Sequence, residues 1–141
     1  MIKSVKGIIV KDNKYLLQLR DNKKNIFFPN FWGLFGGRLD KDETFENALI
    51  RELKEETNLD VRVQKKIFKT QYEMIGLKKK RELNYCECKV VKNNDKIILS
   101  EGKKYNFFLF EQIKRLKIIP LDFVAISTHY YYINNYKSLY S

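Results

Sequence analysis

The sequence contains few of the residues that cross-link or interrupt a chain: two cysteines, two prolines and one histidine among 141 residues. Cys86 and Cys88 lie two positions apart in a strand-like segment, so both side chains are expected on the same face. With no histidine nearby, they do not form the usual ligand set of a zinc site. We therefore expect two reduced thiols that pack as ordinary strand residues, in a fold that needs no disulfide.

Long apolar segments are also missing. No apolar run approaches the roughly 20 residues that a membrane-spanning helix requires, and the N-terminal segment MIKSVKGIIVKD has no secretory signal pattern. The sequence therefore predicts a cytoplasmic protein without a membrane partner. It leaves the oligomeric state open, with a homodimer as one alternative.

The chain does contain enough apolar residues for a single folded domain over residues 1–141. Hydrophobic residues make up 44% of the chain and aromatic residues 14%, which is typical of a packed core and not of a disordered chain. We find no internal repeat, low-complexity linker or domain boundary.

The net charge of +11 is unevenly distributed. Residues 40–60 hold eight acidic and three basic residues, a net charge of −5, so the rest of the chain carries +16. A basic surround attracts polyanions such as nucleotides, diphosphate esters or nucleic acids, and an acidic island within it is able to hold a metal cation. Charge alone leaves a solvated, lysine-rich surface as an equal alternative.

Periodicity and turn signals predict the element order β-β-β-α-β-β-β-α-α, an α/β fold in which helices cover a mixed sheet. The expected strands span residues 4–10, 15–20, 32–35, 61–75, 81–91 and 105–110, and the expected helices span 44–57, 111–116 and 121–136. We expect Gly36 and Gly37 to end the third strand. Pro120 fits near the start of the last helix, where its missing N–H costs little.

The helix expected at residues 44–57 has both of its ends marked. Thr44 is a plausible N-cap, and Asn58 falls where a left-handed residue closes a helix. Phe45, Leu49 and Leu53 recur every four residues and predict a buried stripe.

The same helix carries three carboxylates on one flank. Glu55 and Glu56 follow Glu52 by three and four positions, so the three side chains lie close together on a helix. Such clustering costs stability unless a cation neutralises it, and oxygen ligands suit Mg²⁺ or Mn²⁺. One carboxylate would then be free to act as a base on water. A solvated acidic face is the alternative that the three glutamates alone leave open.

The flanking residues favour the metal site, because residues 37–59 resemble the Nudix box, G-x5-E-x7-R-E-U-x-E-E-x-G-U, in which U is bulky and aliphatic. The fixed positions that match are Gly37, Glu43, Arg51, Glu52, Glu55 and Glu56, and the aliphatic positions are Leu53 and Leu59. Asn58 replaces the last glycine of the box. Because asparagine tolerates the left-handed conformation, this change removes no catalytic group.

The resemblance implies a fold and residue roles. The fold would be a Nudix-type α/β/α sandwich. Glu55 and Glu56 would bind Mg²⁺, or alternatively Mn²⁺, with the backbone carbonyl of Gly36, and Glu52 would be a further ligand or the general base. Family sites often include an acidic residue from another loop, and Glu101 is the candidate here; an exposed turn residue is the alternative reading.

The resemblance also implies that Arg51 pairs with Glu43 and holds the loop against the helix. A bidentate bridge between arginine and carboxylate is rigid. Although both residues belong to the catalytic motif, their main role in this interpretation is structural.

The segment before the box supplies candidates for substrate binding. Phe27, Phe28 and Phe31 are available to stack on a base. Phosphate contacts are expected from Arg38, Lys23 and Lys24. For Trp32 a packing role is favoured over stacking on a ligand, and for His129 a packing role is favoured over catalysis.

The resulting prediction is a Mg²⁺-dependent hydrolase of a diphosphate linkage in a nucleotide-like small molecule, with nucleoside triphosphates and NDP-sugars favoured as substrates. The alternative is a non-catalytic nucleotide- or nucleic-acid-binding module on the same fold. The basic residues form short, dispersed clusters without a known nucleic-acid-binding motif, which argues against a nucleic-acid partner.

Overall fold

The computed structural model describes residues 1–76, 78–91, 96–100, 102 and 104–135. Its elements are β1 (Ile2–Lys11), β2 (Lys14–Leu19), β3 (Trp32–Gly33), β4 (Phe35–Arg38), α1 (Phe45–Thr57), β5 (Val61–Glu73), β6 (Lys80–Val90), β7 (Lys104–Phe108), α2 (Phe110–Ile113) and α3 (Pro120–Asn135). No helix in these described ranges is both long and apolar enough to cross a membrane.

The sheet is mixed and has seven strands. Its main path runs β3-β2-β1-β6-β5, with β4 paired to β1 and β7 paired to β2. Strands β1 and β6 are parallel, whereas the other strand pairs are antiparallel. The expected mixed sheet is therefore confirmed.

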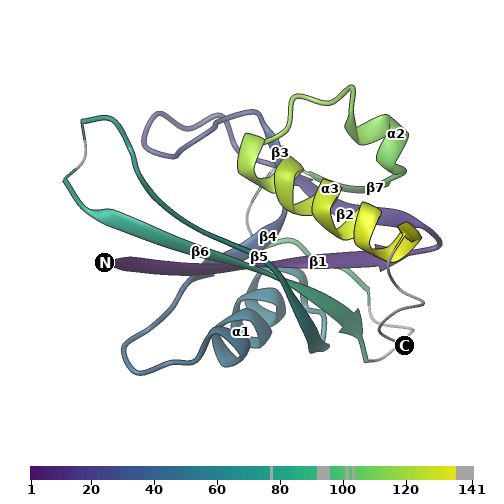
Figure 1. The fold of residues 1–141 in the computed structure, drawn as a ribbon, viewed down its shortest axis with the longest axis horizontal. Coiled ribbons are helices and arrows are strands. Elements are labelled where there is room, and N and C mark those ends of the chain that lie inside the picture. The colour runs from purple at the N-terminus through teal and green to yellow at the C-terminus, as the bar shows by residue number, and fades with distance from the viewer. Residues whose placement is uncertain (77, 92–95, 101, 103, 136–141) are drawn as a thin grey trace.

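Helices cover both faces of the sheet. Figure 1 shows α1 on one side of the central strands and α3, with α2 beyond it, on the other. Each face has its own apolar core, one around Leu49 and Leu53 of α1 and one around Ile113 of α2 and Ile126 of α3. This is the expected α/β/α sandwich.

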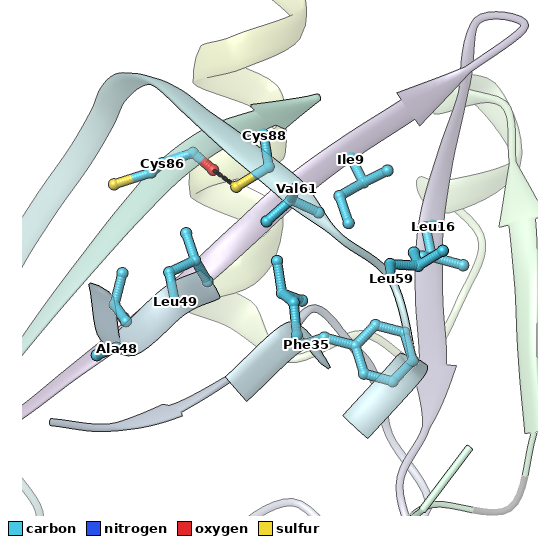
Figure 2. Close-up of a cluster of buried hydrophobic side chains, with 11 residues drawn as sticks. Ile9, Leu16, Phe35, Ala48, Leu49, Leu59, Val61, Cys86 and Cys88 are labelled. Atoms are coloured by element: carbon cyan, nitrogen blue, oxygen red, sulfur yellow. Dashed lines mark hydrogen bonds between the residues drawn. The ribbon is translucent and has the colours of Figure 1, made fainter. Parts of the chain in front are cut away.

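The α1-side core contains both cysteines, as Figure 2 shows beside Leu49 and Val61. Cys86 and Cys88 are buried free thiols, so the prediction that they are packing residues on one strand face is confirmed. Burial raises the pKa of both thiols, which keeps them protonated and unreactive.

Helix α1 begins and ends as its sequence predicts. The Thr44 hydroxyl accepts a hydrogen bond from the Asn47 N–H at 3.1 Å, and Asn58 closes the helix with φ of 65° while its N–H donates to the Lys54 carbonyl. Leu49 and Leu53 are fully buried. The two capping residues and the buried leucines together determine which flank of α1 faces away from the core.

Two expected elements differ in the structure. The strand at residues 32–35 is divided into β3 and β4, and β4 runs through Gly36 and Gly37 instead of ending before them. The reason is the pairing of β4 with β1, which at Gly36 is too close for a Cβ atom. The helix expected at 111–116 is the shorter α2, which gives way to turns after Ile113.

Candidate active site

The two glycines of β4 bring the strand directly against its neighbours. Gly36 pairs with Lys6 of β1, and a Cβ atom at Gly36 would lie 2.1 Å from the Val5 carbonyl oxygen. A Cβ atom at Gly37 would lie 2.3 Å from the Glu52 Cδ atom. The first glycine therefore permits strand pairing, and the second leaves room for a carboxylate from α1.

Arg51 and Glu43 form the predicted bidentate pair. The Nε and Nη2 atoms of Arg51 each lie 2.8 Å from a different oxygen of Glu43. The Asp40 N–H also donates to Glu43 at 2.9 Å, and Arg51 Nη2 donates to the Arg38 carbonyl at 3.1 Å. These bonds tie the loop between β4 and α1 to the helix.

The electrostatics of this pair follow from the contacts. The hydrogen bond from Arg51, followed by that from the Asp40 backbone, lowers the pKa of Glu43 to about 2. The Glu43 carboxylate in turn raises the pKa of Arg51. Both groups are therefore charged at any ordinary pH.

The three carboxylates of the α1 flank line one cavity of about 300 Å³, together with Gly36 and Gly37. They differ in exposure: Glu56 is only 9% exposed, and the side chains of Glu52 and Glu55 are 18% and 59% exposed. The burial of Glu56 and Glu52 is unusual for a solvated acidic face, although Glu55 is exposed. The flank is thus the wall of a polar cavity.

Arg51 also reaches into the carboxylate flank. Its Nη1 atom lies 2.9 Å from a Glu52 oxygen and 3.4 Å from a Glu55 oxygen. Within the described residues no three acidic, histidine or cysteine groups converge closely enough to hold a metal; Glu52 and Glu55 both contact Arg51 instead. In donor chemistry the set still fits a hard divalent cation, which would compete with Arg51 for the two side chains.

The candidate ligand from another loop, Glu101, lies outside the described residues, so its role stays a prediction. Ser100 and Gly102, on either side of it in the sequence, line the same cavity. The Ser100 N–H donates to the Glu56 backbone carbonyl at 3.2 Å. Ser100 therefore lies beside the C-terminal half of α1.

Cations line the cavity together with the carboxylates. Lys23, expected from the sequence, is one of them and lies 3.7 Å from Asp21, whereas Lys24 is absent from the lining. Lys6 and Arg20 also line the cavity, and sequence reasoning missed both. Local sequence patterns do not reveal Lys6, because it reaches the site through the pairing of β1 with β4.

A second cavity, of about 200 Å³, adjoins the first and shares Lys6 and Arg20 with it. Its walls are aromatic and basic, formed largely by Phe27, Phe28, Tyr72, Tyr85, Arg38 and Arg81. Two expected substrate contacts, Phe28 and Arg38, are therefore found here.

Phe31, also expected to contact substrate, lines neither cavity. Its ring packs edge-on against the Phe28 ring, with 5.3 Å between the two centroids. The Lys117 ammonium lies 4.6 Å from the centroid of the Phe31 ring. Phe31 thus packs against Phe28 and Lys117, and its expected contact with substrate stays a prediction.

His129 and Trp32 have the packing environments expected of them. His129 is 1% exposed and lies between the Tyr15 hydroxyl at 2.9 Å and Glu87 at 2.7 Å. Trp32 packs edge-on against Phe108. Neither residue lines the two cavities described above.

Similarity to known proteins agrees with this arrangement. The NUDIX domain family matches residues 2–124, and the chain belongs to that family.

Two relatives match part of the chain. An ADP-ribose pyrophosphatase from Methanocaldococcus jannaschii is 48% identical over 56 residues, which is 40% of this chain and 31% of the relative. A CTP pyrophosphohydrolase from Escherichia coli is 34% identical over 76 residues, 54% of this chain and 55% of the relative. The match thus spans about a third and about half of their lengths.

Solved structures share the fold over almost the whole chain. The E. coli ORF135 protein superposes with a TM-score of 0.78 at 23% identity, covering 98% of this chain and 94% of the other. A C. elegans Ap4A hydrolase complex gives a TM-score of 0.76 at 20% identity, covering 96% and 100%. At these identities the likeness establishes the fold.

Proposed function

We propose that this protein is a Mg²⁺-dependent hydrolase that cleaves the diphosphate linkage of a nucleoside triphosphate or an NDP-sugar. The observation that carries the proposal is the wall formed by Glu52, Glu55 and Glu56, which lines one cavity with Gly36 and Gly37. A non-catalytic binder, the alternative, has no need of three carboxylates at this spacing. The small volume and the carboxylates of this cavity also argue against a nucleic-acid partner.

In this proposal the α1 flank holds the metal. Glu55 and Glu56 are ligands, with the Gly36 carbonyl and Glu101 completing the set, and Glu52 is a further ligand or the base that takes a proton from the attacking water. When bound, Mg²⁺, or Mn²⁺ in its place, supplies the charge that neutralises the diphosphate.

The other residues bind and orient the substrate. Lys6, Arg20 and Lys23 line the same cavity and are placed to bind phosphate oxygens. Arg51 and Glu43 are positioning residues, because they hold the β4–α1 loop on the helix that carries the carboxylates.

The nucleoside is assigned to the second cavity. That cavity is adjacent to the first, and its aromatic walls, including Phe27, Phe28 and Tyr72, suit a flat base. A substrate that spans both cavities would place its diphosphate beside the carboxylates and its base between aromatic rings.

The names of relatives support the reaction class and leave the substrate open. ADP-ribose, CTP and Ap4A, which occur in those names, share the diphosphate linkage. The free, buried thiols support the expected cytoplasmic location, where cysteines stay reduced.

A substrate panel tests the proposal. Nucleoside triphosphates, NDP-sugars, ADP-ribose and dinucleoside polyphosphates are incubated with Mg²⁺, and released phosphate, pyrophosphate and nucleotide are identified. Hydrolysis of at least one class at the diphosphate linkage is expected. Binding without turnover of any class would favour the alternative.

A further inference from the structure

Asp122, at the start of α3, lines the second cavity and is fully buried. One of its oxygens, Oδ1, accepts hydrogen bonds from Lys6 Nζ at 3.0 Å and from the Tyr85 hydroxyl at 2.5 Å. The other, Oδ2, accepts from Lys6 Nζ at 2.9 Å and from the Leu34 N–H at 2.9 Å.

These four bonds use the whole accepting capacity of the carboxylate. An ionised carboxylate has two oxygens with about four lone-pair sites in total. Each oxygen of Asp122 already accepts two donors from the protein. A substrate amino group therefore finds no free acceptor on Asp122, although this is the only carboxylate that lines the second cavity among the described residues.

The remaining charged groups of the second cavity are donors. Arg20, Arg38 and Arg81 line it beside Lys6, and a guanidinium has five N–H donors and no acceptor. Arg81 Nε is buried and has no hydrogen-bond partner within the described part of the chain. The Arg81 guanidinium lies 5.1 Å from the centre of the Phe27 ring, so it is held at the aromatic wall where a base would stack.

We infer that the second cavity selects nucleobases by their carbonyl oxygens. Arg81, which donates, and Asp122, whose oxygens are already occupied, set this preference. Bases with an oxo group at the pyrimidine 4-position or purine 6-position are favoured over bases with an amino group there. An amino group at that position would face the N–H donors of the arginines. Neither the amino group nor the arginine donors would then have a hydrogen-bond partner, which is costly in a desolvated site. This inference rests on the proposed function, since it assumes that the base occupies the second cavity.

Two matched substrate pairs test the inference. UTP and CTP differ at the 4-position, and ITP and ATP differ at the 6-position, with the triphosphate unchanged. Because one base contact discriminates by roughly 1–3 kcal/mol, kcat/KM for the oxo member of each pair should be roughly 5-fold to 150-fold higher. The E. coli relative is named a CTP pyrophosphohydrolase, so such a preference would separate this chain from it.

Two variants assign the preference to residues. Tyr85→Phe removes one donor from Asp122 Oδ1 and keeps the ring, so the UTP/CTP ratio should fall at least about 3-fold as an acceptor becomes available. Arg81→Met removes the guanidinium and should lower the same ratio, whether or not Tyr85→Phe folds. Arg62→Met is the matched control, because Arg62 is an exposed arginine of β5 outside both cavities, and it should leave the ratio unchanged.

The possible outcomes separate the two proposals. Turnover with CTP and ATP preferred would overturn the base preference and leave the hydrolase proposal intact. An oxo preference unaltered by Arg81→Met would remove Arg81 from the account. No turnover of any triphosphate, NDP-sugar, ADP-ribose or dinucleoside polyphosphate, together with tighter binding of UMP than of CMP, would instead sink the hydrolase proposal and support the cavity's preference.

Discussion

Arg51 binds both carboxylate oxygens of Glu43, eight residues earlier in the Nudix box, at 2.8 Å each. The pair connects the loop after β4 to the middle of α1, immediately beside Glu52. Because Arg51 also contacts Glu52 and Glu55, one guanidinium both anchors the loop and orders two of the three carboxylates.

The pair should make stability depend on pH in the acid range. Arg51 lowers the pKa of Glu43 from 4.5 to about 2, so its stabilisation is complete above pH about 4.5 and is lost as the pH falls toward 2. Urea unfolding from pH 6 to pH 3 should show the stability difference between wild type and Glu43→Gln shrinking below pH 4.5.

The control for this measurement is Glu111→Gln, which breaks the surface pair with Lys114. Exposed pairs contribute little, so this variant should follow the wild-type pH dependence closely. A Glu43→Gln difference that stays constant across the pH range would contradict the account.

Replacing each β4 glycine by alanine should have different effects: Gly37→Ala should lower activity, whereas Gly36→Ala should lower stability. In Gly37→Ala the new Cβ meets the end of the Glu52 side chain, which is able to move, so kcat should fall at least about 10-fold with little change in unfolding temperature. In Gly36→Ala the Cβ meets the Val5 carbonyl, and the β1–β4 pairing should weaken. Thermal unfolding and steady-state rates of both variants check this, and equal destabilisation by the two would show that Glu52 is not the group displaced.

Local signals were sufficient to predict helix α1. Thr44, Asn58 and the buried Leu49 and Leu53 all act within the helix itself, so their spacing determines the flank on which the carboxylates lie. The Nudix resemblance added the pairing of Arg51 with Glu43, which the structure confirms.

The second cavity could not be predicted from local sequence patterns. Arg81 lies on β6 and Asp122 on α3, and both line the cavity because Asp122 bonds to Lys6 of β1 and Tyr85 of β6. The two glycines of β4 were misinterpreted for the same reason: glycine often ends a strand, whereas here both glycines pair with Val5 and Lys6 of β1.

Asn58→Gly should be neutral or stabilising by less than about 1 kcal/mol, because Asn58 already has the left-handed φ of 65° that glycine adopts more readily. The matched control is Lys54→Gly inside α1, which should lose roughly 0.5–1 kcal/mol. Urea unfolding and hydrolysis rates of both variants provide the comparison. A folded Asn58→Gly with a clear loss of activity would show that Asn58 does more than close the helix.

Neutral isosteres of the two proposed ligands should separate activity from folding. Glu55→Gln and Glu56→Gln keep side-chain shape but remove charge, so each should lower kcat by at least about 10²-fold. Glu46→Gln is the control, since Glu46 is an exposed residue of the first turn of α1 and lies outside the cavity. Circular dichroism should be the same for all three variants, and full turnover by Glu56→Gln would remove it from the proposed ligand set.

The most direct test of the account is the rate of triphosphate hydrolysis by chelator-treated protein as Mg²⁺ is added back. The carboxylate wall of Glu52, Glu55 and Glu56 predicts no turnover without a divalent cation, a saturable recovery in wild type, and a recovery in Glu56→Gln that needs more Mg²⁺ or fails. Full turnover by the chelator-treated wild type, before any metal is added, would contradict it.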